Sequence, residues 1–515
     1  MSPAATTEAS SDEVPPADGS AGDGPPNDGF TEGPREQRAR FRYRLGLAVI
    51  ALVALAVRWV EILFVRPECG PDGEGPAGCV AIVAGINDPL YVHLQGKAIA
   101  EGHWFVDPLW LRSTGEAVAS AQKPPLYPLL LGLASSLGLT SITAHRLFSG
   151  VLGVVSVLLI AMAAQRIGGR RAGLAAGAIA AVYPMFWVND LLLQTESVFA
   201  GVAAIVLLVA YRFWRDPTTA NAVWLGLAVG LATLTRAESA LLGVFLVLPL
   251  ALRATDLRWR DRFVRLGVSG LAAVVLVSPW VLWNLSRFEE PVYVSTGAGA
   301  VLNTASCDQT YFGDNLGYYG ECFDLATVPS ATQRRMCERI GLEAGCFADP
   351  EQLERVQASL QDRAVYDESE RELIARDQAA AYIADHTSRL PVVMVARVGR
   401  MWDLYRPDQN VRFNDQLEGR GERASQAGLV LYYLLWPAAV WGAVCLYRRR
   451  VTLIPLVAPM LVITVTAALA FGTTRYRIPA DVALVVAAGV GIGALLSRRR
   501  DPSGQDGGPE TEVDR

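Results

Sequence analysis

Lysine is nearly absent from this chain of 515 residues. Only Lys97 and Lys123 are lysines among the 46 basic residues, a bias typical of GC-rich coding. A single arginine therefore carries little information about function, whereas each lysine carries more. Dispersed apolar periodicity is also lacking: hydrophobic residues make up 51% of the chain and come in blocks, which excludes an ordinary soluble domain.

The N-terminal region has almost nothing to bury. Pro, Gly, Ser and acidic residues dominate it, so we expect residues 1–40 to form a disordered tail. No signal peptide fits there, because the first apolar run begins only near Leu45 and is long enough to span a bilayer. We expect the acidic C-terminal residues 498–515 to form a second disordered tail.

Ten apolar blocks match the thickness of a bilayer's hydrocarbon core. Arginine clusters flank them in a pattern that places both termini in the cytoplasm of a multi-pass cell-membrane protein. This alternation requires that the short run 126–139, which follows two prolines, does not cross. It also requires two short spans in 222–252, around the turn at 235–239. The predicted spans are about 45–64, 145–166, 171–188, 197–214, 222–235, 239–253, 265–286, 427–446, 452–471 and 478–497.

These spans divide the chain into functional parts. We expect residues 41–286 to form one transmembrane module that includes an external loop at 66–144. We expect residues 287–426 to form an extracytoplasmic cap and residues 427–497 to form the C-terminal transmembrane helices.

The seven cysteines agree with this topology. Cys445 lies at a cytoplasmic helix end, and the other six lie in loops placed outside, where the oxidising environment preserves disulfides. The simplest connectivity joins neighbours, although six cysteines allow fifteen pairings and free thiols are the alternative. The expected pairs are Cys69–Cys79, Cys307–Cys322 and Cys337–Cys346.

Charged and polar residues gather in the outward loops. A carboxylate there can remove the proton of a hydroxyl acceptor, and Arg or Lys can neutralise a leaving phosphate. Such a set suits a reaction between a phosphorylated lipid and a hydroxyl group. The candidates are Asp88, Lys123, His145, Arg146, Asp190, Glu196, Arg236, Glu238, Arg475, Tyr476 and Arg477.

Several of these residues have simpler interpretations. Asp88 precedes a proline and could cap a helix. Lys123 could be an interfacial anchor, and Arg236 could pair with Glu238 within one turn. Arg475 and Arg477 could be ordinary flanking charge, but basic residues outside the membrane run against the usual bias, which favours phosphate binding.

The order of these motifs resembles a known family. An acid in the first external loop, KPPLYPLLLGL, LATLTRAES and a late RYRIP are similar to the GT-C fold polyprenyl-phosphate-sugar glycosyltransferases, in the branch of protein O-mannosyltransferases and the lipid A aminoarabinose transferase. The similarity is strongest over 84–252, with a second patch at 472–480.

The resemblance implies an all-α polytopic GT-C bundle of about ten transmembrane helices with a juxtamembrane-helix loop and a small external cap. It implies that Asp88 is the catalytic base, with Glu196 as the acid beginning the fourth span. Lys123 would lie near the lipid phosphate, and Arg475 and Arg477 would complete the phosphate pocket. The family often has two adjacent acids where this chain has Asn87-Asp88, a departure that argues against a metal or a second acid at this point. A divalent metal stays an open option, and no cofactor is certain.

The leading hypothesis is an inverting glycosyltransferase. It would move a sugar from a polyprenyl-phosphate donor to an envelope glycan, lipid or protein on the extracytoplasmic face; no nucleic-acid partner is expected. The alternatives are a transporter or flippase of polyprenyl-linked sugars and an inactive structural subunit. Transporters usually place polar residues near mid-membrane, whereas here they lie at one face, which favours the enzyme.

Overall fold

The computed structural model describes residues 34–498 except 70–73, 76–78, 81, 83–87 and 255–256. The chain divides into two units, residues 1–44 and 45–515. The described part of the first unit, 34–44, is the beginning of helix α1 (Pro34–Val60), so this helix begins inside the segment predicted as a disordered tail. The other described helices belong to the second unit. The predictions for residues 1–33 and 499–515 lie outside the described residues.

The described residues are almost entirely helical, with two isolated β-bridges as their only extended pairing. In the part of the chain that the structure describes, six helices are long and apolar enough to cross a membrane, or seven if the bent pair α6 (Arg170–Val182) and α7 (Pro184–Leu191) is one span. The pair bends by 48° where Pro184 begins the second helix. The six are α1, α5 (Ile142–Gly168), α8 (Glu196–Arg215), α11 (Trp259–Leu285), α19 (Glu422–Arg448) and α21 (Ile478–Arg498).

Shorter apolar helices fill the remaining predicted spans. The predicted break near 235–239 is confirmed, because α9 (Thr219–Thr233) ends before it and a 3₁₀ turn, η2 (Ala237–Leu241), begins within it. The chain continues through a π-helical turn, η3 (Gly243–Val247), into α10 (Leu248–Leu252), and α20 is Ile454–Leu469. Each of the ten predicted spans coincides with a helical segment; how many of them cross stays a prediction.

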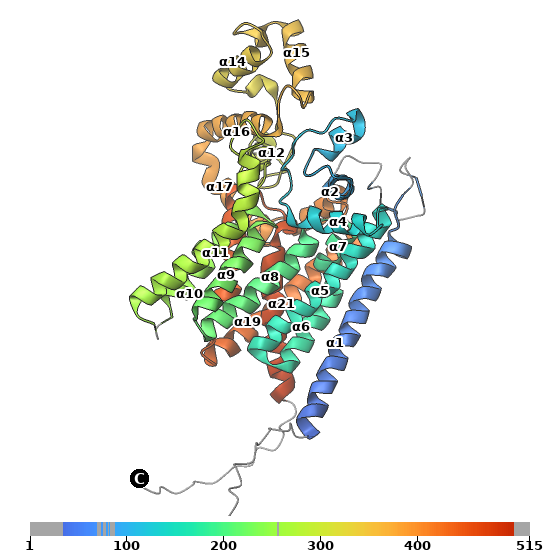
Figure 1. Ribbon diagram of the computed structural model, residues 1–515, viewed down its shortest axis with the longest axis vertical. Coiled ribbons are helices and arrows are strands. Elements are labelled where there is room, and N and C mark those ends of the chain that lie inside the picture. The colour runs from blue at the N-terminus through green and yellow to red at the C-terminus, as the bar shows by residue number, and fades with distance from the viewer. Residues whose placement is uncertain are drawn as a thin grey trace, which may run out of the picture. The chain divides into compact units, whose positions relative to one another are not determined.

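Helix α21 lies at the centre of the second unit. It packs against α5, α6, α8, α19 and α20 (Figure 1). Its side chains Val482, Val485 and Val486 are fully buried. By contrast, α11 leaves Leu271, Val274 and Leu282 exposed, as a helix that faces lipid does.

The contact between α19 and α21 depends on glycines. A Cβ atom on Gly442 would lie 1.9 Å from the carbonyl oxygen of Ala487, and one on Gly491 would lie 2.1 Å from that of Ala438. Such distances require backbone movement, since carbonyl groups cannot rotate away as a side chain can. Small residues therefore set the separation of these helices, as in other membrane helix pairs.

Gly442→Leu should consequently destabilise the protein by about 1–3 kcal/mol or more, the usual cost of overpacking. Thermal unfolding of the purified protein in detergent measures this. Gly270→Leu on α11 is the matched control, because a Cβ at Gly270 meets nothing within 4 Å. Equal melting temperatures for the two variants would contradict the tight α19–α21 contact.

The external loop 66–144 carries α2 (Asp88–Ala100), α3 (Pro108–Thr114) and α4 (Leu126–Ser136). Helix α4 spans only 11 residues, about 16 Å, which is roughly half the hydrocarbon thickness. Its length thus agrees with the prediction that this run does not cross. Helices α2 and α4 pack closely, since a Cβ on Gly96 would lie 2.7 Å from the Cβ of Leu131.

The segment 287–426 is also helical. All three predicted disulfides are confirmed: Cys69–Cys79 in the external loop, and Cys307–Cys322 and Cys337–Cys346 in this segment. Figure 1 shows α14 and α15 beyond α12 and α16, on the side away from α5 and α6. The helices are α12 (Ala298–Thr304), α13 (Asp308–Tyr311), α14 (Ser330–Arg339), α15 (Pro350–Gln361), α16 (Glu368–Asp385), α17 (Leu390–Met401) and α18 (Pro407–Gln416).

Candidate active site

Asp88, the first residue of α2, contacts two cations. Lys123 Nζ donates to Asp88 Oδ1 at 2.8 Å, and Arg475 Nη2 donates to Oδ2 at 2.9 Å. Asp88 thus stands at a helix start, as the capping interpretation requires, but both of its oxygens bond basic side chains. Its side chain is 36% exposed, so solvent or a ligand can reach the carboxylate.

Arg475 joins three carboxylates with its three nitrogens. Besides the bond to Asp88, its Nε donates to Glu196 Oε1 at 3.1 Å and its Nη1 donates to Glu418 Oε2 at 3.2 Å. The planar guanidinium suits this role, because its donors point in fixed, divergent directions.

Arg236 extends the network from the other side of Glu196. Its Nη1 donates to Glu196 Oε1 and its Nε donates to Glu238 Oε1, both at 2.5 Å. Its guanidinium carbon lies 4.1 Å from the centre of the Tyr476 ring, close enough for a cation–π interaction. The predicted Arg236–Glu238 pair is therefore confirmed as part of a larger network.

Local structure explains how these side chains reach one another. Glu196 is the first residue of α8, where the helix dipole favours a negative charge. Arg475 and Tyr476 lie in a 3₁₀ turn, η7 (Thr474–Arg477), immediately before α21. Helices α2, α8 and α21 therefore all bring their N-terminal ends to this network, although they are far apart in the sequence.

Glu418 lies in a turn between α18 and α19 that requires glycine. Gly419 and Gly421 have φ angles of +65° and +82°, a region that glycine adopts readily. Arg66 clamps the turn, since its Nη1 and Nη2 donate to the carbonyl oxygens of Arg420 and Gly419 at 2.8 and 2.5 Å. A Cβ on Gly421 would lie only 3.2 Å from Arg66 Nη1.

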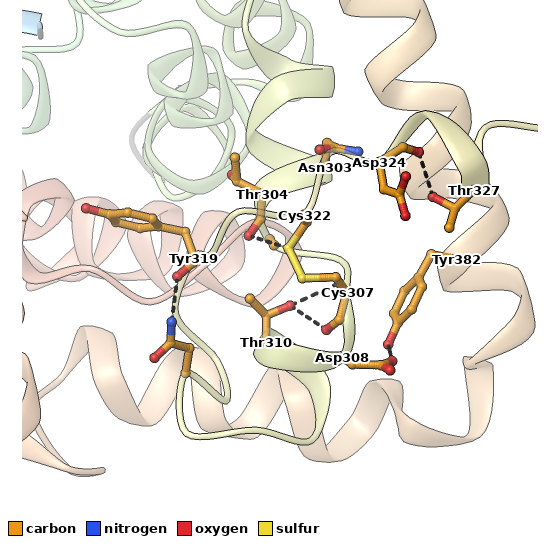
Figure 2. The surroundings of a disulfide bond; sticks show 12 residues. Asn303, Thr304, Cys307, Asp308, Thr310, Tyr319, Cys322, Asp324, Thr327 and Tyr382 are labelled. Carbon is orange, nitrogen blue, oxygen red and sulfur yellow. Dashed lines mark hydrogen bonds between the residues drawn. A yellow bond between two sulfur atoms is a disulfide. The ribbon is translucent and has the colours of Figure 1, made fainter. Parts of the chain in front are cut away.

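A cavity of about 560 Å³ opens beside Asp88, large enough for a small organic ligand. The segment around the Cys307–Cys322 disulfide contributes Thr304 and Tyr319 to the wall of this cavity. Figure 2 shows Thr304 beside the disulfide and Tyr319 in the same segment. The hydroxyl of Tyr319 donates to Glu418 Oε1 at 3.3 Å. The polar lining side chains are Asp88, Gln194, Thr304, Tyr319, Gln416, Glu418, Arg475 and Tyr476.

The cations control the protonation of Asp88. Burial alone would raise the pKa of its carboxyl group, but Lys123 and Arg475 lower the pKa below its ordinary range. Burial likewise would lower the pKa of Arg236, yet Glu238 and Glu196 raise it. At neutral pH the carboxyl group of Asp88 is therefore ionised, as its two ion pairs require.

The structure does not bring every predicted residue to this network. Arg477 is buried and donates to Asp481 Oδ1 at 2.9 Å and to Asp403 Oδ2 at 2.8 Å. Asp190 pairs with Arg58 at 2.6 Å inside the bundle, where both side chains are 1% exposed.

His145 and Arg146 also have partners elsewhere. His145 lies 3.0 Å from His93 between their Nδ1 atoms, and burial lowers the pKa of His93 to about 3. Arg146 donates to the backbone carbonyls of Leu191 and Arg66, at 2.9 and 2.6 Å. These contacts connect the external loop to the bundle and do not face the cavity.

A divalent metal was left open by the sequence. Within the described ranges, no group of three His, Cys, Asp or Glu residues lies close enough together to hold a metal ion. Asn87, the neighbour of Asp88, lies outside the described residues. The carboxylate of Asp88 bonds Lys123 and Arg475, so both of its oxygens already have cationic partners.

Glu418 and Tyr319 are the site residues that sequence reasoning missed. Both belong to the segment 287–426, which has many acidic and aromatic residues without an informative pattern. The available signal for Glu418 was its position just before Gly419 and Gly421, close to the start of a predicted span.

Residues 122–283 match the family model described as dolichyl-phosphate-mannose-protein mannosyltransferase. This match contains the KPPLYPLLLGL and LATLTRAES motifs, and with them Lys123, Glu196 and Arg236. It therefore confirms, for this part of the chain, the resemblance predicted from the motifs. The described residues are almost entirely helical, and their long apolar helices support a multi-pass membrane protein. The match includes neither Asp88 nor Arg475.

Two solved structures are similar to this chain at low identity. The oligosaccharyltransferase AglB from Archaeoglobus fulgidus, in complex with an inhibitory peptide and a dolichol-phosphate, is 14% identical over 92% of this chain and 53% of its own length, with a TM-score of 0.46. ArnT from Cupriavidus metallidurans, bound to undecaprenyl phosphate, is 15% identical over 88% of this chain and 79% of its own, with a TM-score of 0.37. This chain spans about half the length of the former, and at these TM-scores nothing follows about its chemistry. No curated protein sequence matches the chain.

Proposed function

We propose that this protein is a glycosyltransferase that moves a sugar from a polyprenyl-phosphate donor to a cell-envelope acceptor on the extracytoplasmic face. The observation that carries the proposal is the contact of Asp88 with both Lys123 and Arg475 at the edge of a cavity. In this arrangement the carboxylate of Asp88 is a proton acceptor, and Lys123 and Arg475 beside it are a pair of cations that can bind a phosphate group. The family match over 122–283 supports a phosphate-linked sugar as the donor.

The reaction assigns a role to each of these residues. An acceptor hydroxyl oxygen attacks the anomeric carbon, the bond from that carbon to the phosphate oxygen breaks, and polyprenyl monophosphate leaves. Asp88 takes the proton of the hydroxyl group as general base. Lys123 and Arg475 neutralise the charge that develops on the leaving phosphate. Attack from the face opposite the phosphate gives inversion.

Glu196 acts by orienting both arginines of the network. One of its oxygens accepts from Arg236 and Arg475, while its other oxygen is buried without a hydrogen-bond partner among the described residues. Such an atom is costly unless a ligand hydroxyl satisfies it. Glu196 is thus the second carboxylate of the site.

Donor binding also activates the base. In the free protein Lys123 and Arg475 lower the pKa of Asp88, which makes it a weak proton acceptor. A donor phosphate that attracts the same two cations weakens their hold on Asp88. The pKa of Asp88 then rises toward its ordinary range when a donor is present, which makes the carboxylate a better proton acceptor at the moment of transfer.

The direct test uses purified protein with labelled decaprenyl- or undecaprenyl-phosphate sugars and envelope glycans, lipids or proteins. Mass spectrometry should find the glycosylated acceptor and an equal amount of polyprenyl monophosphate. Movement of the donor lipid across a vesicle membrane without product would favour a transporter instead. Absence of both activities across the donor panel would contradict the proposal.

The orientation can be tested in whole cells. In a Cys445→Ser background, cysteines replacing Trp104 and Leu404, which are 56% and 78% exposed, should react with an impermeant maleimide in intact cells. A cysteine replacing Tyr447, which is 75% exposed, should react only after permeabilisation. The reverse pattern would place the site in the cytoplasm.

A further inference from the structure

A second cavity, of about 1130 Å³, lies between η3–α10 and the α19–α20 connection. It is at the opposite end of α19 from the candidate active site. Glu418 stands just before this helix, whereas Arg448 is its last residue; the 27 residues between helix start and end cover about 40 Å. The proposed reaction does not use this cavity.

The lining of this cavity divides into a basic edge and an apolar wall. Arg253, Arg448 and Arg450 form the edge, and all three are exposed. The described lining residues include no carboxylate. Among the described residues, no ion-pair partner is found for Arg253, Arg448 or Arg450. The apolar wall includes Phe245, Leu250, Val457 and Leu461.

The wall runs along the helices away from the arginines. Leu461 is seven residues beyond Ile454, the first residue of α20, or about 10 Å along the helix. Trp214 and Tyr447 line the cavity beside the basic edge, and such aromatic residues are typical of the membrane–water boundary. The edge therefore lies at headgroup depth and the wall at the depth of acyl chains.

The backbone supports a role for Arg450. Its φ angle is +56°, a left-handed conformation that usually takes glycine at a helix end and costs about 1 kcal/mol for other residues. An arginine at such a position indicates that its guanidinium group has a role that glycine could not fill.

We propose that this cavity binds an anionic phospholipid, with the phosphate headgroup between Arg253, Arg448 and Arg450 and an acyl chain along Phe245, Val457 and Leu461. Basic pockets between transmembrane helices recognise anionic headgroups in this way. A neutral lipid fits the apolar wall equally well but brings no negative charge to the three arginines.

The test uses the full-length protein in nanodiscs of phosphatidylcholine with a minor fraction of phosphatidylglycerol. Native mass spectrometry then counts the lipids retained after release. We expect wild-type protein to retain phosphatidylglycerol in preference to phosphatidylcholine. The combined variant Arg253→Gln, Arg448→Gln, Arg450→Gly should reduce that preference by at least about tenfold. Glycine at 450 relieves the left-handed conformation, so loss of lipid would not reflect unfolding.

Two further variants separate the contributions. Val457→Trp fills the apolar wall and leaves all charges in place, so it should also reduce retention. Arg212→Gln, Arg258→Gln, Arg260→Gln removes the same number of exposed arginines outside the cavity lining, so retention should be unchanged. Unchanged retention in either cavity variant, equal loss in the control, or equal retention of phosphatidylcholine would overturn the proposal.

Discussion

Asp88→Asn should lower the rate of sugar transfer by roughly 10²–10⁴-fold, the usual contribution of a positioned general base. The substitution keeps the shape of the side chain and replaces a proton acceptor by an amide. Asparagine begins a helix about as well as aspartate, so α2 should remain intact. Donor binding should be preserved or strengthened, because Lys123 and Arg475 lose one competing negative charge.

Glu238→Gln is the matched control for this variant. It removes a carboxylate from the same network, but Glu238 bonds only to Arg236 among the described residues and does not line the cavity. Its turnover should fall far less. Similar losses in the two variants would show that Asp88 acts as a member of the charge network and not as the base.

The pH dependence provides an independent test of Asp88. Its pKa in the folded protein is below the unfolded value of about 3.9. The stabilisation from its ion pairs is therefore fully present above about pH 4 and is lost as the pH falls through the lower folded value. Turnover measured as kcat/KM, which reports the free enzyme, should show no acidic limb from Asp88 between about pH 5 and 8. If the wild-type kcat/KM showed an acidic limb in this pH range and Asp88→Asn removed it, Lys123 and Arg475 would not lower the pKa of Asp88 as stated.

Arg475→Gln should be the most damaging single change to the site. The guanidinium bonds Asp88, Glu196 and Glu418, and the side chains of Glu196 and Glu418 are only 0% and 8% exposed. Removing one partner from a buried ion pair typically costs about 3–5 kcal/mol, because the other charge stays without compensation. We expect a large fall in the unfolding temperature together with loss of donor binding.

Arg475→Lys should not restore the wild-type behaviour. A lysine ammonium is a single point charge and cannot bond three carboxylates in the divergent directions of a guanidinium. Arg412→Gln is the control for arginine loss, because its side chain is 58% exposed and its pair with Asp408 is on the surface, where such pairs contribute about 0–1 kcal/mol. Near-normal stability and binding in Arg475→Lys would mean that position 475 supplies charge alone.

The sequence by itself determined the helical segments, the break near 235–239 and the three disulfides. Apolar blocks, short polar turns and cysteine spacing depend on residues that are close in sequence. The structures that they predict therefore do not depend on contacts between distant parts of the chain. The motifs also identified most of the network, because Lys123, Glu196 and Arg236 lie in stretches that resemble one family.

Only the tertiary structure decided which charges meet. Asp88 and Arg475 are 387 residues apart, and no local pattern relates them. Arg475 and Arg477 are equivalent by sequence, yet residues two apart in a 3₁₀ turn point to different sides. The first faces Asp88 and the second faces Asp403 and Asp481. Glu418 joins the network only because a glycine turn clamped by Arg66 directs it there. The packing of the helices sets the directions of these side chains, and they cannot be derived from local patterns in a single sequence.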